Sequence, residues 1–332
     1  MRCYGSSYLI FENLYPDRSA EGVIMSKSII SLAILCLSVC VYGQNSEKVD
    51  DLLKRGLRSH ESGNYAAALE DFTRVIELTS TLRSTSNSKR SFAETSEEAA
   101  QRRSIRVLDP RTATAYINRG NTYFFMAKVD DALDDYEKAL RIYPGLPEGY
   151  SCRAGVWLMK KDYDRAISDF QRSIKLDPKL IKAHIGIGMA LFEKGERDNG
   201  LAKFDATAAM APKNAEVYYR RGDARFVTGN TAGALADYEL ALTLDPKYEG
   251  AYLGRGRLRY AQLDFDGAIK DLTKAIELDG RVPNGYMLRG FVLMMQRKDA
   301  EADADFRRAI EILPSMQAEI EAGAKQIKAI RN

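Results

Sequence analysis

The sequence has few of the residues from which catalytic and metal sites are usually built. Its 332 residues include four cysteines and only two histidines, His60 and His184, which lie far apart. Three of the cysteines belong to an N-terminal leader: Cys3, Cys36 and Cys40. The remaining chain keeps Cys152 alone, so no disulfide framework, Cys–His pair or metal cluster is expected at ordinary spacing. No strand is predicted, so no phosphate-binding glycine loop follows one. We therefore predict no cofactor, no metal and no enzymatic activity.

The sequence also lacks a strong charge bias. Hydrophobic residues make up 45% and charged residues 29%, which is typical of a soluble folded protein. The net charge of +3 matches the excess within residues 83–112, a serine-rich segment with seven basic and four acidic side chains. We interpret this segment as an insertion that forms a loop, with an acidic partner as the alternative use of its arginines. Because the rest is balanced, we predict no nucleic-acid binding.

Long apolar runs are missing except for one, from Ile29 to Val41. It is too short to cross a bilayer comfortably and follows Lys27, so residues 25–43 are predicted to be a signal peptide, with cleavage before Gln44. Residues 1–24 are then an upstream extension. We expect the chain to be secreted or periplasmic, without a membrane span after cleavage. The alternative is a lipid anchor at Cys40, although valine precedes this cysteine where a lipobox has a small residue.

The body of the chain is repetitive. A shift of 34 residues aligns a column of prolines with one glycine: Pro110, Pro144, Pro178, Pro212, Pro246, Gly280 and Pro314. Small residues form a second column: Gly120, Ala154, Gly188, Gly222, Gly256 and Gly290. A third column is also small: Ala132, Ala166, Gly200, Ala234, Ala268 and Ala302. A fourth is bulky: Tyr136, Phe170, Phe204, Tyr238, Leu272 and Phe306. These columns define repeats two to seven over residues 113–314, and the same spacings recur out of phase in repeat one, residues 44–82.

Each unit contains two stretches with apolar spacing of three and four, separated by a turn and ended by proline, which predicts two helices. Small residues let the paired helices approach, and aromatics fill the gap to the next pair. The pattern resembles the tetratricopeptide repeat. This resemblance implies an all-α, right-handed superhelical solenoid of helix-turn-helix repeats. Residues 315–332 are predicted to be a C-terminal capping helix, with Met316, Ile320, Ala324, Ile327 and Ile330 on its apolar side.

Two further columns indicate ion pairs between the helices of a repeat. The expected structural pairs are Arg55 with Asp71, Arg119 with Asp135, Arg153 with Asp169, Arg221 with Asp237, Arg255 with Asp271, and Arg289 with Asp305. Repeat four alone has neither partner, with Ile187 and Lys203 in their places, and it has His184 instead of tyrosine. Because both partners are lost together, we predict that they pair. Repeat four is then the weakest unit, either merely softened or a hinge.

The resemblance also implies that the first helix of each unit lines a concave groove. The positions that the family uses there correspond, in repeats five to seven, to Tyr219, Asp223, Phe226, Leu253, Arg257, Tyr260, Met287, Phe291, Met294 and Met295. Such a groove suits an amphipathic helix or an extended hydrophobic peptide. For the methionine-rich end, packing against the terminal cap is an equally open interpretation.

We therefore predict a non-catalytic scaffold or adaptor for protein–protein interaction, with a protein or peptide partner that the sequence does not identify. The alternative is a structural spacer of the cell envelope that binds no peptide. The oligomeric state is unknown from the sequence.

Overall fold

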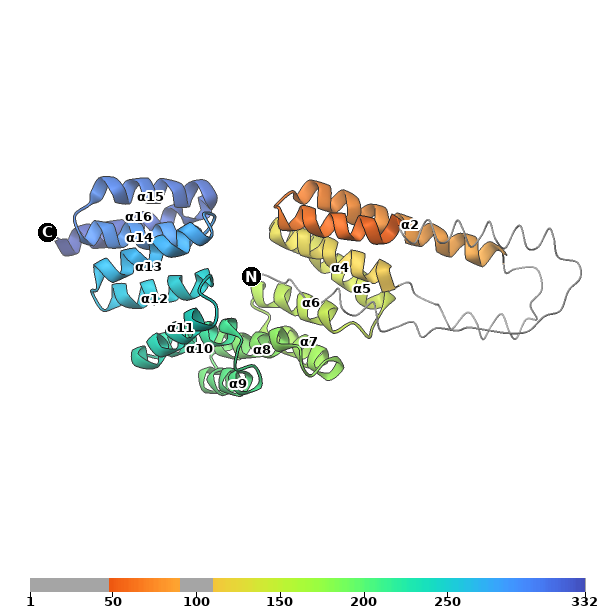
Figure 1. Cartoon of the computed structure of the whole chain (residues 1–332), viewed down its shortest axis with the longest axis horizontal. Helices are drawn as coiled ribbons and strands as arrows, with labels where there is room; N and C mark the ends of the chain where they lie inside the picture. Colours follow the sequence, from red (N-terminus) through yellow and green to blue (C-terminus); the bar gives the residue numbers. More distant parts are fainter. Residues whose placement is uncertain (1–47, 90–109, 332) are drawn as a thin grey trace, which may run out of the picture. The chain divides into compact units, whose positions relative to one another are not determined.

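The computed structural model describes residues 48–89 and 110–331, and all regular structure within them is helical. The signal peptide, the lipid-anchor cysteine and the middle of the predicted insertion lie outside these residues. Repeat one consists of a helix over residues 48–61 and α2 (Tyr65–Lys89). The next helices alternate in matched pairs along the chain (Figure 1): α4 (Pro110–Phe125) with α5 (Val129–Ile142), α6 (Pro147–Met159) with α7 (Tyr163–Leu176), and α8 (Ile181–Lys194) with α9 (Arg197–Met210).

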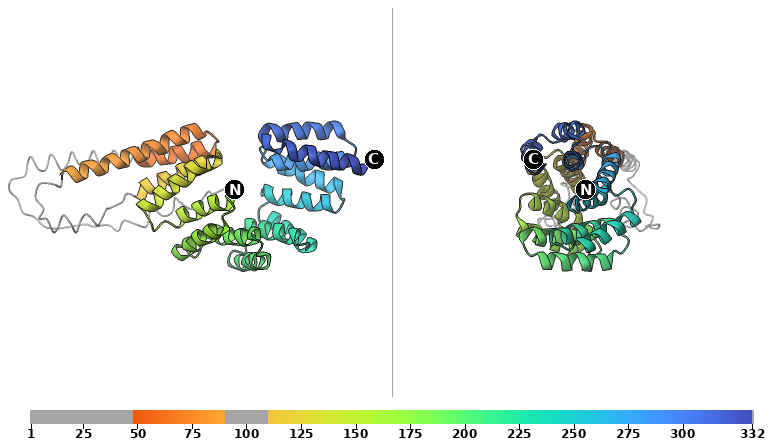
Figure 2. Two further views of the ribbon diagram at one scale, coloured as in Figure 1. Left: turned by 180° about the vertical axis from the view of Figure 1, so that it is seen from behind. Right: turned by 90° about the vertical axis from the view of Figure 1, so that its left-hand side faces the viewer.

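The remaining pairs follow the same order (Figure 2): α10 (Ala215–Val227) with α11 (Thr231–Leu244), α12 (Glu249–Ala261) with α13 (Phe265–Leu278), and α14 (Pro283–Met295) with α15 (Asp299–Ile312). Within each pair the two helices contact each other, and the second also contacts the first helix of the next pair. Each pair therefore shares its apolar surface with both neighbours, as a linear repeat array requires.

Prolines mark the repeat boundaries, with one exception. Pro144 and Pro178 follow directly on the last turns of α5 and α7, where proline cannot continue a helix. Pro110 instead begins α4, a position that proline tolerates because the first helical N–H groups have no partner. The preceding helix α2 continues to Lys89, into the range expected for the insertion.

The turn between the two helices of a repeat places one residue in the left-handed region. Glycine occupies this position in three repeats, with φ of 79° at Gly63, 98° at Gly195 and 84° at Gly229. Four other repeats have residues with a Cβ there, at φ between 58° and 63°: Ala127, Lys161, Leu263 and Arg297. Second helices then begin with a side-chain cap in several repeats; for example, Asn230 accepts a hydrogen bond from the Gly233 N–H at 3.0 Å.

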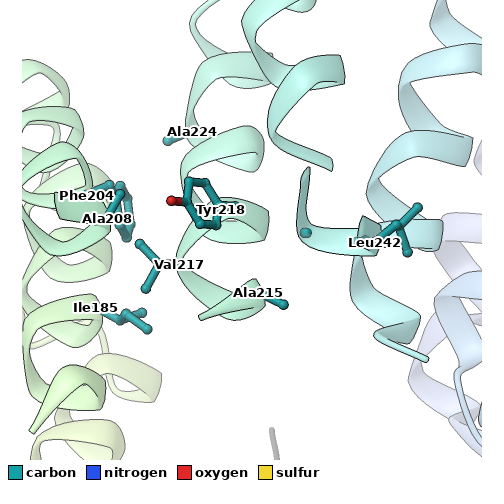
Figure 3. Close-up of a cluster of buried hydrophobic side chains, with 10 residues drawn as sticks. Ile185, Phe204, Ala208, Ala215, Val217, Tyr218, Ala224 and Leu242 are labelled. Carbon is teal, nitrogen blue, oxygen red and sulfur yellow. The ribbon is translucent and has the colours of Figure 1, made fainter. Parts of the chain in front are cut away.

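The core is built where a small residue of the first helix meets an aromatic ring of the second. A Cβ added at Gly222 would lie 2.8 Å from the Tyr238 ring, and one at Gly188 would lie 2.8 Å from Phe204. Both rings are almost completely buried. Figure 3 shows how the core continues across the boundary between repeats four and five, where Val217 and Tyr218 of α10 lie between Phe204 of α9 and Leu242 of α11.

The array ends in a short 3-10 turn, η1 (Pro314–Met316), and α16 (Gln317–Arg331). Three residues expected on the apolar side of this helix are buried, namely Met316, Ile320 and Ile327. Ile330 is 73% exposed and differs from the prediction, because α14, the helix that α16 packs against, ends before it can cover the last turn. Arg331 bonds Asp299 at 2.6 Å, as Lys160 bonds Asp130 and Lys194 bonds Asp164 between earlier repeats. The helix α16 nevertheless packs mainly against α14, whereas each first helix from α6 to α14 packs more against the second helix of the preceding repeat than against its first.

Candidate binding surface

Each predicted arginine lies against its predicted aspartate across the two helices of its repeat. In repeats two, three and seven the Nε and Nη2 groups of the arginine donate to the two carboxylate oxygens at 2.7 or 2.8 Å. Repeats one, five and six have the same bidentate arrangement. The hydrogen bond to aspartate raises the pKa of the Arg153 guanidinium, as it does for the other arginines of the column. These pairs fix the relative position of the two helices.

A tyrosine three residues before the arginine completes the arrangement. The Arg221 guanidinium lies over the Tyr218 ring, 5.2 Å from its centroid, and Arg255 lies 5.7 Å from Tyr252. The Tyr218 hydroxyl donates to the Pro212 carbonyl oxygen at 3.2 Å, so the first helix is also tied to the preceding repeat boundary. The same stacking occurs in repeats two, three and seven. Sequence reasoning identified the ion pair and missed the stacked tyrosine.

Repeat four replaces all three members of this arrangement. Ile187 has the arginine position and packs in the apolar cluster of Phe170 and Trp157. His184 has the tyrosine position and is 7% exposed. Its Nε2 lies 3.0 Å from the Pro178 carbonyl oxygen, and its Nδ1 lies 2.8 Å from Nζ of Lys203, which has the aspartate position. A contact between an imidazole and a single ammonium group thus stands where the other repeats have an ion pair.

Repeats five and six reinforce their pairs with a second arginine. Arg225 donates to Asp237 at 2.8 Å, and Arg259 donates to Asp271 at the same distance. Arg221 also reaches Asp205 of repeat four at 2.9 Å, so it connects two repeats. The structure describes no such second arginine at Asp169 in repeat three.

The surface predicted to line a groove is partly open in repeats five and six. We call Tyr219, Asp223, Phe226, Leu253, Arg257 and Tyr260 the first-helix surface, and each of them is half-buried. Asp223 accepts hydrogen bonds from the Tyr238 hydroxyl at 2.8 Å and from Nη2 of Arg257 at 2.7 Å. The Arg257 guanidinium in turn lies 5.0 Å from the centroid of the Phe226 ring. The structure thus brings these residues together across α10 and α12.

Aromatic hydroxyls near this surface are held in their neutral form. Burial raises the pKa of Tyr219, Tyr238 and Tyr248 well above the ordinary value, and the charge of Asp223 acts in the same direction on the first two. The Tyr219 and Tyr248 rings lie 5.4 Å apart. Tyr260 is affected more simply, because burial alone raises its pKa. These hydroxyls can donate hydrogen bonds and cannot act as bases near neutral pH.

The corresponding surface of repeat seven is covered by α16. Met287 and Met294 are only 7% and 3% exposed, and with Phe291 and Met295 they pack in one cluster with Met316, Ile320 and Ile327. Gly323 of α16 faces the Phe291 ring. The prediction that Met287 and Met294 face an open groove is therefore wrong, because the C-terminal helix covers them. The other interpretation, packing against the cap, describes this end of the chain.

One apolar feature escaped the sequence analysis. Near the C-terminal ends of three first helices, equivalent positions hold exposed hydrophobic residues: Phe125 at 42%, Met159 at 54% and Val227 at 52%. Only repeat seven contributed this position, Met295, to the prediction. The 34-residue alignment places these residues in one column with Met295, so the signal was present in the sequence.

In residues 48–89 and 110–331 no group of three or more His, Cys, Asp and Glu side chains is arranged to hold a metal ion. In the same ranges no helix has both the length and the apolar character needed to cross a membrane. A shallow depression of about 510 Å³ lies between α12 and α13, but its lining includes the paired Arg255 and Asp271.

Comparison with known proteins agrees with this architecture. Profiles described as tetratricopeptide repeat match residues 113–146, 147–180, 185–249 and 253–316. No curated protein matches the chain. Among solved structures, a tetratricopeptide repeat protein from Parabacteroides merdae is similar with a TM-score of 0.52 and 20% identity, over 74% of this chain and 99% of that one.

Two other solved structures are longer than the matched region. Yeast Tom70 has a TM-score of 0.59 at 19% identity, over 85% of this chain and 64% of its own. A chain of the APC/C hetero-tetramer Cut9–Hcn1 has a TM-score of 0.55 at 15% identity, over 79% of this chain and 52% of its own. At these identities the likeness shows the fold alone. The predicted fold class, an all-α superhelical solenoid of such repeats with a C-terminal helix, is confirmed.

Proposed function

Because the chain belongs to the tetratricopeptide repeat family, we propose that it is a non-catalytic scaffold that binds a peptide or an amphipathic helix on the first-helix surface of repeats five and six. Proteins of this family are generally interaction scaffolds, so the partner is expected to be a protein. The specific proposal concerns where and what it binds.

The observation that carries the proposal is the partial exposure of four apolar side chains on two consecutive first helices. Tyr219 and Phe226 are seven residues apart on α10, and so are Leu253 and Tyr260 on α12, so each pair lies on one face of its helix. None of the four is fully buried by its neighbours. An apolar strip of this kind is the usual seat of an amphipathic helix or a hydrophobic peptide.

The C-terminal helix supports the proposal by its own packing. In repeat seven, the equivalent positions Met287, Phe291 and Met294 accept α16, whose apolar side faces them and whose polar side faces solvent. The chain thus already seats one amphipathic helix on these columns. Repeats five and six have side chains of similar size and apolar character in the same columns.

A spacer without peptide binding is the second candidate, and the burial of Met287 and Met294 favours it. In that case the C-terminal helix covers the methionine-rich surface of repeat seven, and the array serves only to hold its N-terminal and C-terminal repeats apart. The two candidates differ in whether the first-helix surface of repeats five and six captures a partner.

The deciding experiment is a pull-down with three versions of the tagged chain: wild type, Phe226→Ala with Tyr260→Ala, and a control with Met210→Ala and Leu240→Ala. The control removes two exposed apolar side chains from the second helices α9 and α11. Loss of a partner from the first variant alone, with helical content and unfolding midpoint unchanged, supports the proposal. Equal capture by all three, or no capture, contradicts it and favours the spacer.

We further propose that the chain is exported by a signal peptide at residues 25–43, with a lipid anchor at Cys40 as the alternative. The support is the apolar run after Lys27. Mass spectrometry of the N-terminal peptide from the source cells separates the outcomes. An N-terminus at Gln44 supports cleavage, an acylated Cys40 supports the anchor, and an intact N-terminus from Met1 contradicts both.

A further inference from the structure

The substitution of the tyrosine, arginine and aspartate in repeat four leaves a titratable group at its centre. His184 is almost completely buried in α8, where it bonds the Pro178 carbonyl oxygen through Nε2 and Nζ of Lys203 through Nδ1. Among the equivalent tyrosines, Tyr218 and Tyr252 donate to the corresponding carbonyl oxygens, of Pro212 and Pro246. Repeat four is thus the one repeat, among those described, in which the contact between the two helices depends on an imidazole.

The two partners of His184 fix its protonation state. A backbone carbonyl only accepts hydrogen bonds, so Nε2 carries the proton that is donated to Pro178. A lysine ammonium only donates, so Nδ1 must accept from Lys203 with its lone pair. The imidazole is therefore neutral in this arrangement. A second proton would put an N–H against an ammonium group.

We propose that repeat four is a pH-sensitive joint: protonation of His184 removes the acceptor of Lys203, sets two cations against each other, and loosens α8 from α9. The Arg–Asp pairs of the other repeats keep their charges under the same conditions, because arginine and ionised aspartate do not change charge in mildly acidic solution. The joint lies between repeats two to three and repeats five to seven.

The surroundings of His184 contain little that would compensate the added charge. The helices α6, α7, α9 and α10 pack against α8. Lys203 on α9 and Asp177, just after α7, are the charged groups that act on the imidazole among the described residues. Arg153 on α6 is bound by Asp169 of α7, and Arg221 on α10 is bound by Asp237 and Asp205. Asp177 alone favours the charged imidazole.

The direction of the pH effect follows from the folded and unfolded states of this residue. Burial lowers the pKa of His184 below its ordinary value of 6.5, the Pro178 carbonyl and Asp177 oppose this, and Lys203 adds to it. Burial likewise lowers the pKa of Lys203. A depressed histidine pKa means that the unfolded state binds the proton first. The stabilisation is complete above pH 6.5 and decreases as the pH falls below that value.

Hydrogen exchange on the full chain at pH 7.5 and pH 5.5, corrected for intrinsic rates, tests the joint. We expect the protection factors of α8 and α9 amides to fall severalfold at pH 5.5, and by about tenfold at most, because an imidazole with the ordinary pKa of 6.5 is about nine-tenths protonated there. The amides of α12 and α13 are the internal control, and their protection should stay within about twofold. The other described histidine, His60, lies in repeat one and cannot produce a change confined to α8 and α9.

Two variants separate the joint from a general effect of acid. His184→Gln keeps a donor and an acceptor without a titrating group, so the loss of protection in α8 and α9 should disappear. Lys203→Met keeps the histidine and removes the facing cation, so the loss should shrink. Should one variant fold poorly, the other still decides. A wild-type pH response that is equal in α8–α9 and α12–α13, or one that persists in His184→Gln, overturns the proposal.

Discussion

Repeats four and five share the same helix–turn–helix arrangement and differ in the polar contact that joins their two helices. Repeat five joins them with charge: Arg221 and Arg225 both bind Asp237, and Tyr218 lies under the first guanidinium. Repeat four joins them with a neutral imidazole and one lysine. Both repeats bury an aromatic ring against a glycine, Tyr238 in one and Phe204 in the other. The apolar core is therefore common to both, and the polar contact is variable.

This difference separates two roles within the repeat. Ring-to-glycine packing makes the pair of helices possible, since burial of apolar area is the main favourable term in folding. The polar contact fixes the relative position of the two helices. A buried ion pair often contributes little net stability, but removing only one partner is costly because the other charge stays buried and unpaired. A repeat can then exchange its ion pair for another contact, provided that both partners change together, as they do in repeat four.

The largest expected effect tests the common core. Tyr238→Ala and Phe204→Ala should each reduce the free energy of unfolding by about 3–5 kcal/mol, because each leaves a cavity among rigid neighbours. Tyr238→Ala should be the costlier by about 1 kcal/mol, since it also removes the hydroxyl that donates to Asp223. Urea denaturation followed by circular dichroism measures both.

The matched variant Tyr238→Phe isolates the hydroxyl and should by itself account for that difference. A much smaller cost for Phe204→Ala than for Tyr238→Ala would show that the two repeats do not share one kind of core.

The second prediction concerns the ion pairs. Arg153→Ala should lower the free energy of unfolding by about 3 kcal/mol, because the carboxylate of Asp169 stays largely buried after its guanidinium partner is removed. Arg221→Ala should cost clearly less, since Arg225 continues to bind Asp237. The measurement is again the free energy of unfolding in urea, with Arg172→Ala on the exposed side of α7 as the control. Equal losses for the two arginines would contradict the supporting role of Arg225.

The smallest effect comes from converting repeat four into the form of its neighbours. The triple variant His184→Tyr, Ile187→Arg and Lys203→Asp should change the free energy of unfolding by about 1 kcal/mol or less at pH 7.5. It should also abolish the acid sensitivity of α8 and α9. Ile187→Arg alone is the control and should destabilise, because the new arginine meets Lys203 without a carboxylate. Stabilisation by this single variant would mean that the columns are independent.

Much of this architecture is readable from the sequence because each repeat constrains the others. A single Gly222 or Tyr238 says little, but the same pair of types at 34-residue spacing indicates close contact between two helices. The joint loss of Arg and Asp in repeat four likewise predicted the ion pair. The comparison of the chain with itself supplied what one repeat alone does not contain.

The state of the last repeat could not be read in the same way. Whether Met287 and Met294 face solvent depends on where α16 lies, and its apolar pattern is compatible with several docking positions. The contact between His184 and Lys203 was also missed, because no other repeat has a histidine and a lysine at these two positions. Comparison between repeats predicts the contacts that they share, but it does not predict a contact that occurs in only one of them.

The left-handed turn residue described for each repeat leaves room for improvement by design. A residue with a Cβ in this conformation costs roughly 1–2 kcal/mol more than glycine, and part of that is offset by the greater freedom of glycine in the unfolded chain. Four of the described turns carry such residues, Ala127, Lys161, Leu263 and Arg297, while Gly63, Gly195 and Gly229 have the same position in repeats one, four and five. Substitution of glycine at these four turns is therefore expected to increase the free energy of unfolding of the array, and none of the four positions belongs to the first-helix surface.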